Sequence, residues 1–427
     1  MLKSRLAKSP VAVQTLYAIT VAFGAYFCMY GFRKPFAVAT FEAYALWGID
    51  YKILLIISQV LGYMSSKFIG IKVIAELKQG SRAISMILLI VVAELALLGF
   101  GLVPYPYNFI FLFLNGLPLG MIWGIVFSYL EGRRTSELLG VGLCASFIVS
   151  SGAVKSVGKI VMDSWGSGEF WMPFVTGLIF LLPLIIFTYL LDQIPPPTEA
   201  DEAMRCKRLP MSASDRRRFF LSFAPGLLLL IGFYMLLTAY RDFRDNFAAE
   251  LWSALGYGEA PEIFTLAEIP IAVIVLLLLG LSMYIRNNKS AFLTYHVLIL
   301  ISGLLIGLCT YLFQIGQLSP ALWMILVGLG LYLCYVPFNC MLFDRMIAVV
   351  KRPANAGYLI YLADAFGYLG SVSILLYKNF GQANLSWLDF FVGISYALSV
   401  ASVVLIVCSM IYFFGFKLRK KQTLSWT

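Results

Sequence analysis

The sequence predicts an all-α membrane protein in which twelve transmembrane helices form two pseudo-symmetric six-helix bundles and both termini are cytoplasmic. Of the 427 residues, 61% are hydrophobic and only 13% are charged, which excludes a soluble core beneath a polar surface. The apolar residues form continuous runs of about 20, the length of a helix that crosses the hydrocarbon. A β-barrel would instead show short segments of alternating polarity. The two halves of the chain also share a motif, described below.

Charged residues and Gly/Pro punctuation divide the apolar sequence into twelve segments. The first could pass for a signal peptide because basic residues precede it, but it has full length and no small-residue cleavage site closes it. We therefore expect it to be retained as a helix. The expected spans are about 14–33, 53–75, 83–103, 107–130, 138–161, 170–191, 219–241, 263–285, 291–313, 319–343, 355–377 and 389–416.

Lysine and arginine residues collect in the two tails and in alternate loops, which places both termini in the cytoplasm. The net charge of +10 therefore reflects topology, and no nucleic-acid partner is needed to explain it. The longest inner loop begins near Pro195-Pro196-Pro197 and carries mixed charge, as a domain linker does. We expect an amino-terminal bundle at 1–194, a linker at 195–218 and a carboxy-terminal bundle at 219–427.

Several classes of function are disfavoured by what the sequence lacks. Six of the seven cysteines fall inside expected helices and only Cys206 lies in a loop, which makes a disulfide framework improbable. Metal-ligand spacing, nucleophile–base arrangements and ATP-binding motifs are also absent from the sequence. We expect no enzyme activity, no cofactor and no metal.

The first and seventh helices repeat one motif: Tyr26 precedes Arg33 as Tyr234 precedes Arg241. A duplicated membrane protein that keeps a cation at matching places is typical of a two-domain transporter with its site at the midplane. A cation within hydrocarbon costs several kcal/mol unless it meets water, a partner or a ligand. Two forked guanidinium groups suit a tetrahedral oxyanion. The alternative is that both arginines reach the outer interface.

The six-plus-six organisation with a charged central loop resembles the major facilitator superfamily. Within it, Arg33-Lys34-Pro35-Phe36-Ala37 and Ser66-Lys67-Phe68-Ile69-Gly70 resemble the organophosphate:phosphate antiporters. The resemblance implies a multi-pass protein of the cell inner membrane that exchanges a phosphorylated metabolite for phosphate. It also implies that Arg33 and Arg241 clamp the phosphate and that Lys67 contacts the substrate.

The agreement with the antiporters is incomplete. Cys144-Ala145-Ser146 stands where they have a histidine after a Cys-Ala pair. Asp242 and Asp245 follow Arg241 and could neutralise the arginines.

Further charges fall inside the expected helices. Lys67 and Asp364 lie near the midplane, whereas Lys155 and Glu268 lie roughly 9 Å from the outer side at a rise of ~1.5 Å per residue. The superfamily resemblance implies that the helices of each pair face each other across the domain boundary. We therefore expect interdomain ion pairs, with Lys155 and Glu268 in an outer gate, or else charges that reach water in the cavity. Glu94 has no evident partner and receives no role.

A cytoplasmic latch is also suggested by resemblance. The segment 76–82 looks like a degraded form of the superfamily's loop signature, and two charged helix ends occupy matching places in the two halves. The alternative is a tight turn with solvated charges. The latch would consist of Glu76, Lys78, Arg82, Glu131 and Asp344.

These observations together predict a secondary active transporter that moves a small organic anion by alternating access around a midplane cationic site. The ligand residues would be Arg33, Arg241 and Lys67, with Tyr26 and Tyr234 beside them. Two alternatives stay open: a transporter-like membrane sensor of such a ligand, and a carrier for a carboxylate or another polar solute.

Overall fold

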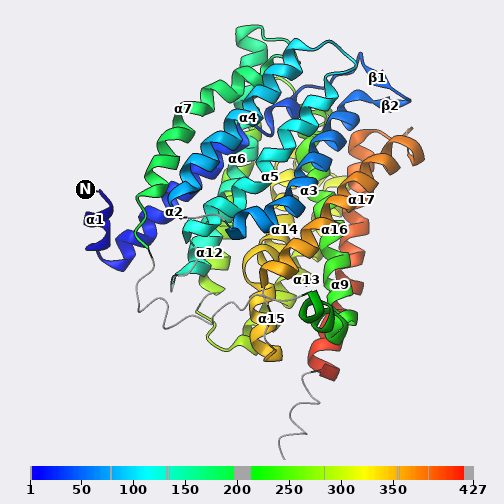
Figure 1. Cartoon of the computed structure of the whole chain (residues 1–427). Helices are drawn as coiled ribbons and strands as arrows, with labels where there is room; N and C mark the ends of the chain where they lie inside the picture. Colours follow the sequence, from blue (N-terminus) through cyan, green and yellow to red (C-terminus); the bar gives the residue numbers. More distant parts are fainter. Residues whose placement is uncertain are drawn as a thin grey trace, which may run out of the picture. The chain divides into compact units, whose positions relative to one another are not determined.

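The computed structural model describes residues 2–417 except 77–78, 131–132, 134, 197–212, 283, 353, 355 and 383. The described chain is almost entirely helical (Figure 1). Eleven described helices are long and apolar enough to cross a membrane, and α3 (Tyr51–Glu76), with 26 residues, occupies the remaining expected span. Every expected segment thus coincides with a helix, and the prediction of an all-α membrane protein is confirmed.

The long helices follow the expected order along the chain. Besides α3, the long helices are α2 (Val11–Tyr30), α4 (Arg82–Leu102), α5 (Phe109–Leu130), α6 (Ser136–Trp165), α7 (Met172–Asp192), α9 (Ala213–Asn246), α12 (Glu268–Ser282), α13 (Asn288–Gln314), α14 (Pro320–Cys340), α16 (Ala356–Leu376) and α17 (Trp387–Ala401). The last one continues through η4 (Ser402–Ile406), α18 (Val407–Met410) and η5 (Ile411–Lys417). The short elements are α1 (Leu2–Ala7), η1 (Pro35–Val38), η2 (Gln79–Ser81), α10 (Ala248–Ala254), α11 (Ile263–Leu266), α15 (Leu342–Val350) and η3 (Tyr377–Gly381).

A small β-hairpin between α2 and α3 was not expected. Strands β1 (Ala45–Leu46) and β2 (Ile49–Asp50) pair antiparallel, with Leu46 opposite Ile49. The two-residue turn Trp47-Gly48 has positive φ at both residues, 55° and 74°. This is the backbone that a two-residue hairpin of this twist needs, and glycine adopts it without strain.

The chain forms two compact units. Unit 1 comprises Met1–Arg205, Arg244–Val273 and Leu375–Trp387, and unit 2 comprises Cys206–Phe243, Ile274–Ile374 and Leu388–Thr427. The segments 244–273 and 375–387 thus belong with unit 1, although the sequence placed them in the bundle at 219–427. The division into 1–194, 195–218 and 219–427 stays a prediction.

In unit 1, α3 packs along α5, α4 packs against α5 and α7, and α2 packs against α6 and α7. Glycines bring the backbones of α3 and α5 together: a Cβ at Gly120 would lie 2.7 Å from the Tyr63 carbonyl oxygen. Small residues permit this close approach of membrane helices. The two helices therefore pack backbone against backbone.

In unit 2, α13 packs along α14. Helix α9 is kinked at Phe223, where φ is −127° and ψ is 15°. Pro225 lies two residues further on and has no N–H to donate to the preceding turn, which explains the kink.

Candidate functional site

The chain leaves the first membrane helix at the point where the predicted cations lie. Helix α2 ends at Tyr30, and η1 begins at Pro35. Proline has no N–H to donate to the preceding turn, whereas Lys34 before it keeps helical φ and ψ of −105° and −17°. Arg33 and Lys34 therefore lie in a break, where they are only 5% and 4% exposed. This burial argues against an Arg33 side chain that faces lipid, and its role as a ligand stays a prediction.

Arg33 and Lys67 meet at one aromatic ring of unit 1. The Arg33 guanidinium carbon lies 4.0 Å from the centroid of the Tyr63 ring, and the Lys67 Nζ lies 5.3 Å from the same centroid. Tyr30 also contacts Arg33 at 5.9 Å, and Trp123 of α5 contacts Lys67 at 5.6 Å. These five residues are called the Tyr63 cluster below. Tyr26 borders it through its ring contact with Tyr30, at 5.6 Å.

Local helix geometry explains the cluster. Tyr63 and Lys67 are four residues apart on α3 and so share one face. An ammonium or guanidinium group within about 6 Å of a ring centroid is attracted by the negative face of the ring. The sequence analysis found both cations but missed Tyr63, although the i,i+4 spacing to Lys67 could have indicated it.

Two buried amides hold the broken end of α2 in place. Gln59 donates to the Arg33 carbonyl at 2.9 Å and to Asn115 Oδ1 at 2.8 Å. Asn115 Nδ2 in turn donates to the carbonyls of Phe32 and Ala93, both at 3.0 Å. Carbonyls released where a helix ends need such donors when they are buried. The amides thereby fix the backbone that carries Arg33, a role that the sequence analysis did not foresee.

A comparable cation–aromatic arrangement exists within unit 2. The Arg241 guanidinium carbon lies 4.3 Å from the ring centroid of Tyr335, which stacks on Tyr234 at 5.2 Å. The Tyr234 hydroxyl donates to Asp364 at 2.8 Å and also contacts Asn339 Oδ1 at 3.4 Å. These residues are called the Tyr335 cluster below. It joins two residues that the sequence analysis treated separately, Tyr234 and Asp364.

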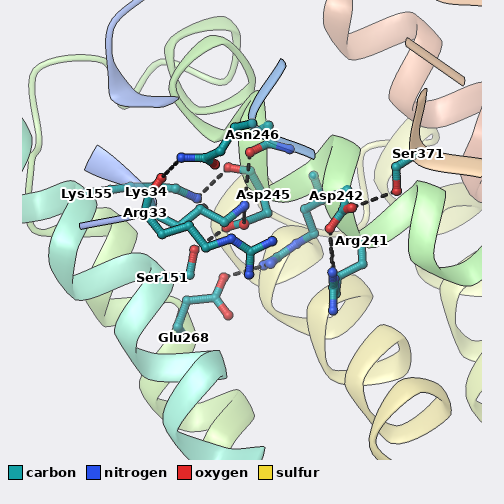
Figure 2. A network of polar contacts seen from close by, with 12 residues as sticks. Arg33, Lys34, Ser151, Lys155, Arg241, Asp242, Asp245, Asn246, Glu268 and Ser371 are labelled. Carbon is teal, nitrogen blue, oxygen red and sulfur yellow. Dashed lines mark hydrogen bonds and ion pairs between the residues drawn. The ribbon is translucent and has the colours of Figure 1, made fainter. Parts of the chain in front are cut away.

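Arg241 is neutralised within its own unit. Its Nε and Nη2 donate to Asp242 Oδ1 at 3.1 and 2.6 Å, and Ser371 donates to Asp242 Oδ2 at 2.6 Å (Figure 2). One of the two acids suspected from the sequence does bind Arg241. Arg33 and Arg241 belong to different units, and their predicted joint clamp on a phosphate stays a prediction.

Asp245 is the centre of an ion-pair network in unit 1. It pairs with both Lys34 and Lys155 and accepts a hydrogen bond from Ser151 (Figure 2). Lys34 Nζ also donates to Asn246 Oδ1 at 3.0 Å. Both lysines are almost fully buried, with side chains 5% and 3% exposed. One carboxylate thus compensates two buried ammonium groups.

The expected pairing of Lys155 with Glu268 was wrong. Lys155 binds Asp245, while Glu268 Oε1 binds Arg244 Nη1 at 2.7 Å. The reason is that α9 continues to Asn246, beyond the expected end at 241, and so carries two further charged residues into this region.

A further ion pair of unit 1 joins Lys52, at the start of α3, to Glu250 of α10. Burial raises the pKa of the Glu250 carboxyl above its ordinary value, and the Lys52 ammonium opposes that rise. By the predicted topology the three ion-pair groups all lie toward the outer ends of their helices. They are called the outer network below: Lys34, Lys52, Lys155, Arg244, Asp245, Glu250 and Glu268.

The predicted cytoplasmic latch is described only in part. Arg82 Nη1 donates to the Ser128 carbonyl at 3.2 Å, and its guanidinium carbon lies 5.4 Å from the Tyr129 ring. Asp344 is exposed in the first turn of α15. The remaining latch residues lie outside the described side chains, so the latch stays a prediction; they are Glu76, Lys78 and Glu131. Within the described part of the chain, no group of three or more His, Cys, Asp or Glu residues could hold a metal ion.

Comparisons with known proteins bear on both fold and family. The crystal structure of a D-xylose-proton symporter matches with a TM-score of 0.62, over 95% of this chain and 97% of that chain, at 14% sequence identity. The match confirms the major facilitator fold but not the organophosphate:phosphate antiporter branch. No curated protein matches the sequence. The profile of DUF5690, a family of unknown function, matches residues 35–415, which is most of the chain. The chain therefore belongs to the DUF5690 family.

Proposed function

We propose that this protein is a secondary active transporter that moves a small organic anion across the cell inner membrane by alternating access. The fold supports this proposal, because major facilitator proteins move solutes past a midplane site between two bundles. The observation that carries the anionic substrate is the Tyr63 cluster, where Arg33 and Lys67 contact the same ring.

The electrostatics of the Tyr63 cluster favour a negatively charged ligand. Two cations near one ring repel each other, and burial strengthens that repulsion because the local dielectric is low. An anion that binds between them offsets the repulsion and gains charge-assisted hydrogen bonds from both groups. The forked guanidinium of Arg33 suits a carboxylate or phosphate, and the Lys67 ammonium supplies a point charge.

We propose a phosphorylated metabolite, exchanged for inorganic phosphate, as the substrate class. The support is the resemblance of the segments around Arg33 and Lys67 to the antiporters. Asp242 restricts the role of Arg241 in this proposal, because an incoming anion must compete with a carboxylate already bound to it. Tyr234 and Asp364 would then respond to the ligand through Tyr335, which contacts both Arg241 and Tyr234.

In the same proposal, the outer network closes the outer side of the protein. Lys34, Lys155 and Asp245 join the broken end of α2, the helix α6 and the end of α9. Breaking a buried pair by removing one partner costs about 3–5 kcal/mol. A network of this kind stabilises the closed state of a two-state structure and must separate when the outer side opens.

Exchange in proteoliposomes tests the proposed function. Vesicles preloaded with phosphate would receive radiolabelled phosphate outside, and sugar phosphates, glycerol phosphate, dicarboxylates or D-xylose would be tested as competitors. We expect phosphate exchange that phosphorylated metabolites inhibit and that Arg33→Gln or Lys67→Gln abolishes. The matched control is Lys159→Gln, because the Lys159 side chain is 24% exposed and pairs with Asp163 on the same helix.

Other outcomes would select the alternatives. Uptake of radiolabelled D-xylose by the same vesicles, without phosphate exchange, would replace the anion by a neutral polar solute, which the neutralised Arg241 would favour. Binding of an anion without any exchange would identify a transporter-like sensor. Dicarboxylate exchange alone would keep the cationic site and exclude the phosphorylated substrate.

A further inference from the structure

Glu94 is a buried acid in the middle of a membrane helix. It lies 12 residues after Arg82 and 8 before Leu102, the two ends of α4. These separations correspond to about 18 and 12 Å at a rise of ~1.5 Å per residue. The residue is 6% exposed. The carboxyl group therefore lies deep in the hydrocarbon region.

Neither carboxyl oxygen of Glu94 has a hydrogen-bond partner among the described residues. The buried amide of Asn115, which contacts the backbone of the residue before Glu94, donates to the carbonyls of Ala93 and Phe32. On α7, the Thr176 hydroxyl donates to the Met172 carbonyl. The polar side chains around Glu94 are thus engaged elsewhere.

The helices packed against α4 supply no cation. Those helices are α5 and α7, and the short η2 precedes α4. The sequence of α5 contains no Lys, Arg, Asp or Glu, and α7 contains only Asp192 at its end. The other titratable groups are Tyr129 near the end of α5, Tyr189 near the end of α7 and Arg82. These groups lie three or more turns from the level of Glu94. Arg33, after the end of α2, lies closer to that level, because Asn115 Nδ2 donates to the carbonyls of both Phe32 and Ala93; its guanidinium lies over the Tyr63 ring and makes no hydrogen bond to Glu94.

A glycine makes the room that the carboxyl group occupies. A Cβ at Gly177 of α7 would lie 2.8 Å from the Glu94 carboxyl carbon. Leu95, which follows Glu94, and Leu178, which follows Gly177, have side chains that are 58% and 47% exposed, as expected for side chains that face lipid. Glu94 therefore sits in an apolar cradle one side chain away from the lipid.

We propose that Glu94 is a proton-binding site, a neutral carboxylic acid at neutral pH, and a point of covalent modification by apolar carbodiimides. An ionised carboxylate without a partner is far costlier to bury than a neutral acid. Protonation removes the charge without any rearrangement of α4 and α7. The proposal does not depend on the solute that is transported.

The chemistry of the modification requires the proton that Glu94 carries. The carboxylic acid transfers its proton to a carbodiimide nitrogen, and the carboxylate oxygen bonds to the central carbon to give an O-acylisourea. Acyl migration to nitrogen then yields a stable N-acylurea. The sum is an addition, with no leaving group and no oxidant. An ionised, water-exposed carboxylate lacks that proton, and an apolar reagent dissolved in lipid does not reach it.

Infrared spectroscopy of the membrane-embedded protein tests the proton directly. We expect the wild-type protein at pH 7 to show a carbonyl stretch of a protonated carboxylic acid that is lost in Glu94→Gln. Because an amide is close in shape to the neutral acid, the variant should keep its melting temperature. An unchanged carbonyl region in Glu94→Gln would overturn the proposal, whether or not a reagent reaches the site.

Modification and packing give two further readouts. Dicyclohexylcarbodiimide should label the peptide containing Glu94 and leave the half-exposed Asp163 unlabelled, and labelling of Asp163 alone would contradict the proposal. Gly177→Ala should lower the melting temperature of the wild type and have a much smaller effect in Glu94→Ala, where the carboxyl group is gone. Equal effects in both backgrounds would refute the cradle.

Discussion

Replacing Asp245 by asparagine should open the outer side of the protein. The substitution keeps the shape of the side chain but leaves Lys34 and Lys155 without their shared carboxylate. Both ammonium groups are buried, and breaking such a pair costs about 3–5 kcal/mol. At 1.4 kcal/mol per factor of ten, the closed state loses at least ~100-fold in its equilibrium with an open one.

The opening can be measured as accessibility of a buried residue beside the network. Ser150 is fully buried next to Ser151, which contacts Asp245. In Ser150→Cys protein, a membrane-impermeant maleimide added from outside should label residue 150 at least ~100-fold faster when Asp245→Asn is present. Peptide mass mapping separates this label from label on the native cysteines.

A surface pair provides the control for this measurement. Asp163 pairs with Lys159 at 3.3 Å, and its side chain is 45% exposed. Exposed pairs contribute about 0–1 kcal/mol, so Asp163→Asn should leave labelling unchanged. Adding Lys155→Met to Asp245→Asn removes one of the two unpaired ammonium groups. The double variant should therefore label residue 150 more slowly than Asp245→Asn alone. Unchanged labelling in Asp245→Asn would refute the closure of the outer side by this network.

Three further predictions concern single contacts. Glu268→Gln removes a charged partner of the buried Arg244 and should cost about 3–5 kcal/mol of unfolding free energy, measured in detergent. Arg244→Met in the same chain should recover part of the loss, and fully additive effects of the two substitutions would exclude a direct interaction between the two side chains. Tyr234→Phe removes a hydrogen bond to Asp364 and should cost about 1.5–3 kcal/mol in the same assay; an unchanged free energy of unfolding would show that this hydrogen bond does not stabilise the Tyr335 cluster. Gln59→Leu leaves the Arg33 carbonyl without its donor and should cost about 1–3 kcal/mol, and no loss of stability would show that the amide does not hold the end of α2.

The membrane helices could be predicted from the sequence because each one rests on a local property, a continuous apolar run of sufficient length. Arg33 and Lys67 could be predicted for a similar reason, since a cation inside such a run is unusual by itself. Tyr63 required one step more, the recognition that its position relative to Lys67 places both on one helical face.

The ion-pair partners could not be predicted because they depend on where helices end. Lys155 and Glu268 lie at similar depths, which suggested that they pair with each other. The five additional helical residues at the end of α9 instead supply Asp245 as the partner of Lys155 and Arg244 as the partner of Glu268. The turn at Trp47-Gly48 is too short to leave a periodic signal in the sequence. Contacts between residues far apart in the chain are decided by packing, not by local pattern.

The glycine-lined seam between α3 and α5 bears on how the proposed ligand site could change its specificity. Tyr63 and Lys67 are mounted on one of these helices and Trp123 on the other. Because the backbones already touch at Gly120, the two helices have no room to slide nearer or to accept larger residues at the seam. The distance between the side chains that these helices contribute to the Tyr63 cluster is therefore set by the scaffold. In the proposed site, a change of ligand would have to come from exchanging the side chains themselves, which makes positions 63, 67 and 123 the natural places to compare among members of the DUF5690 family.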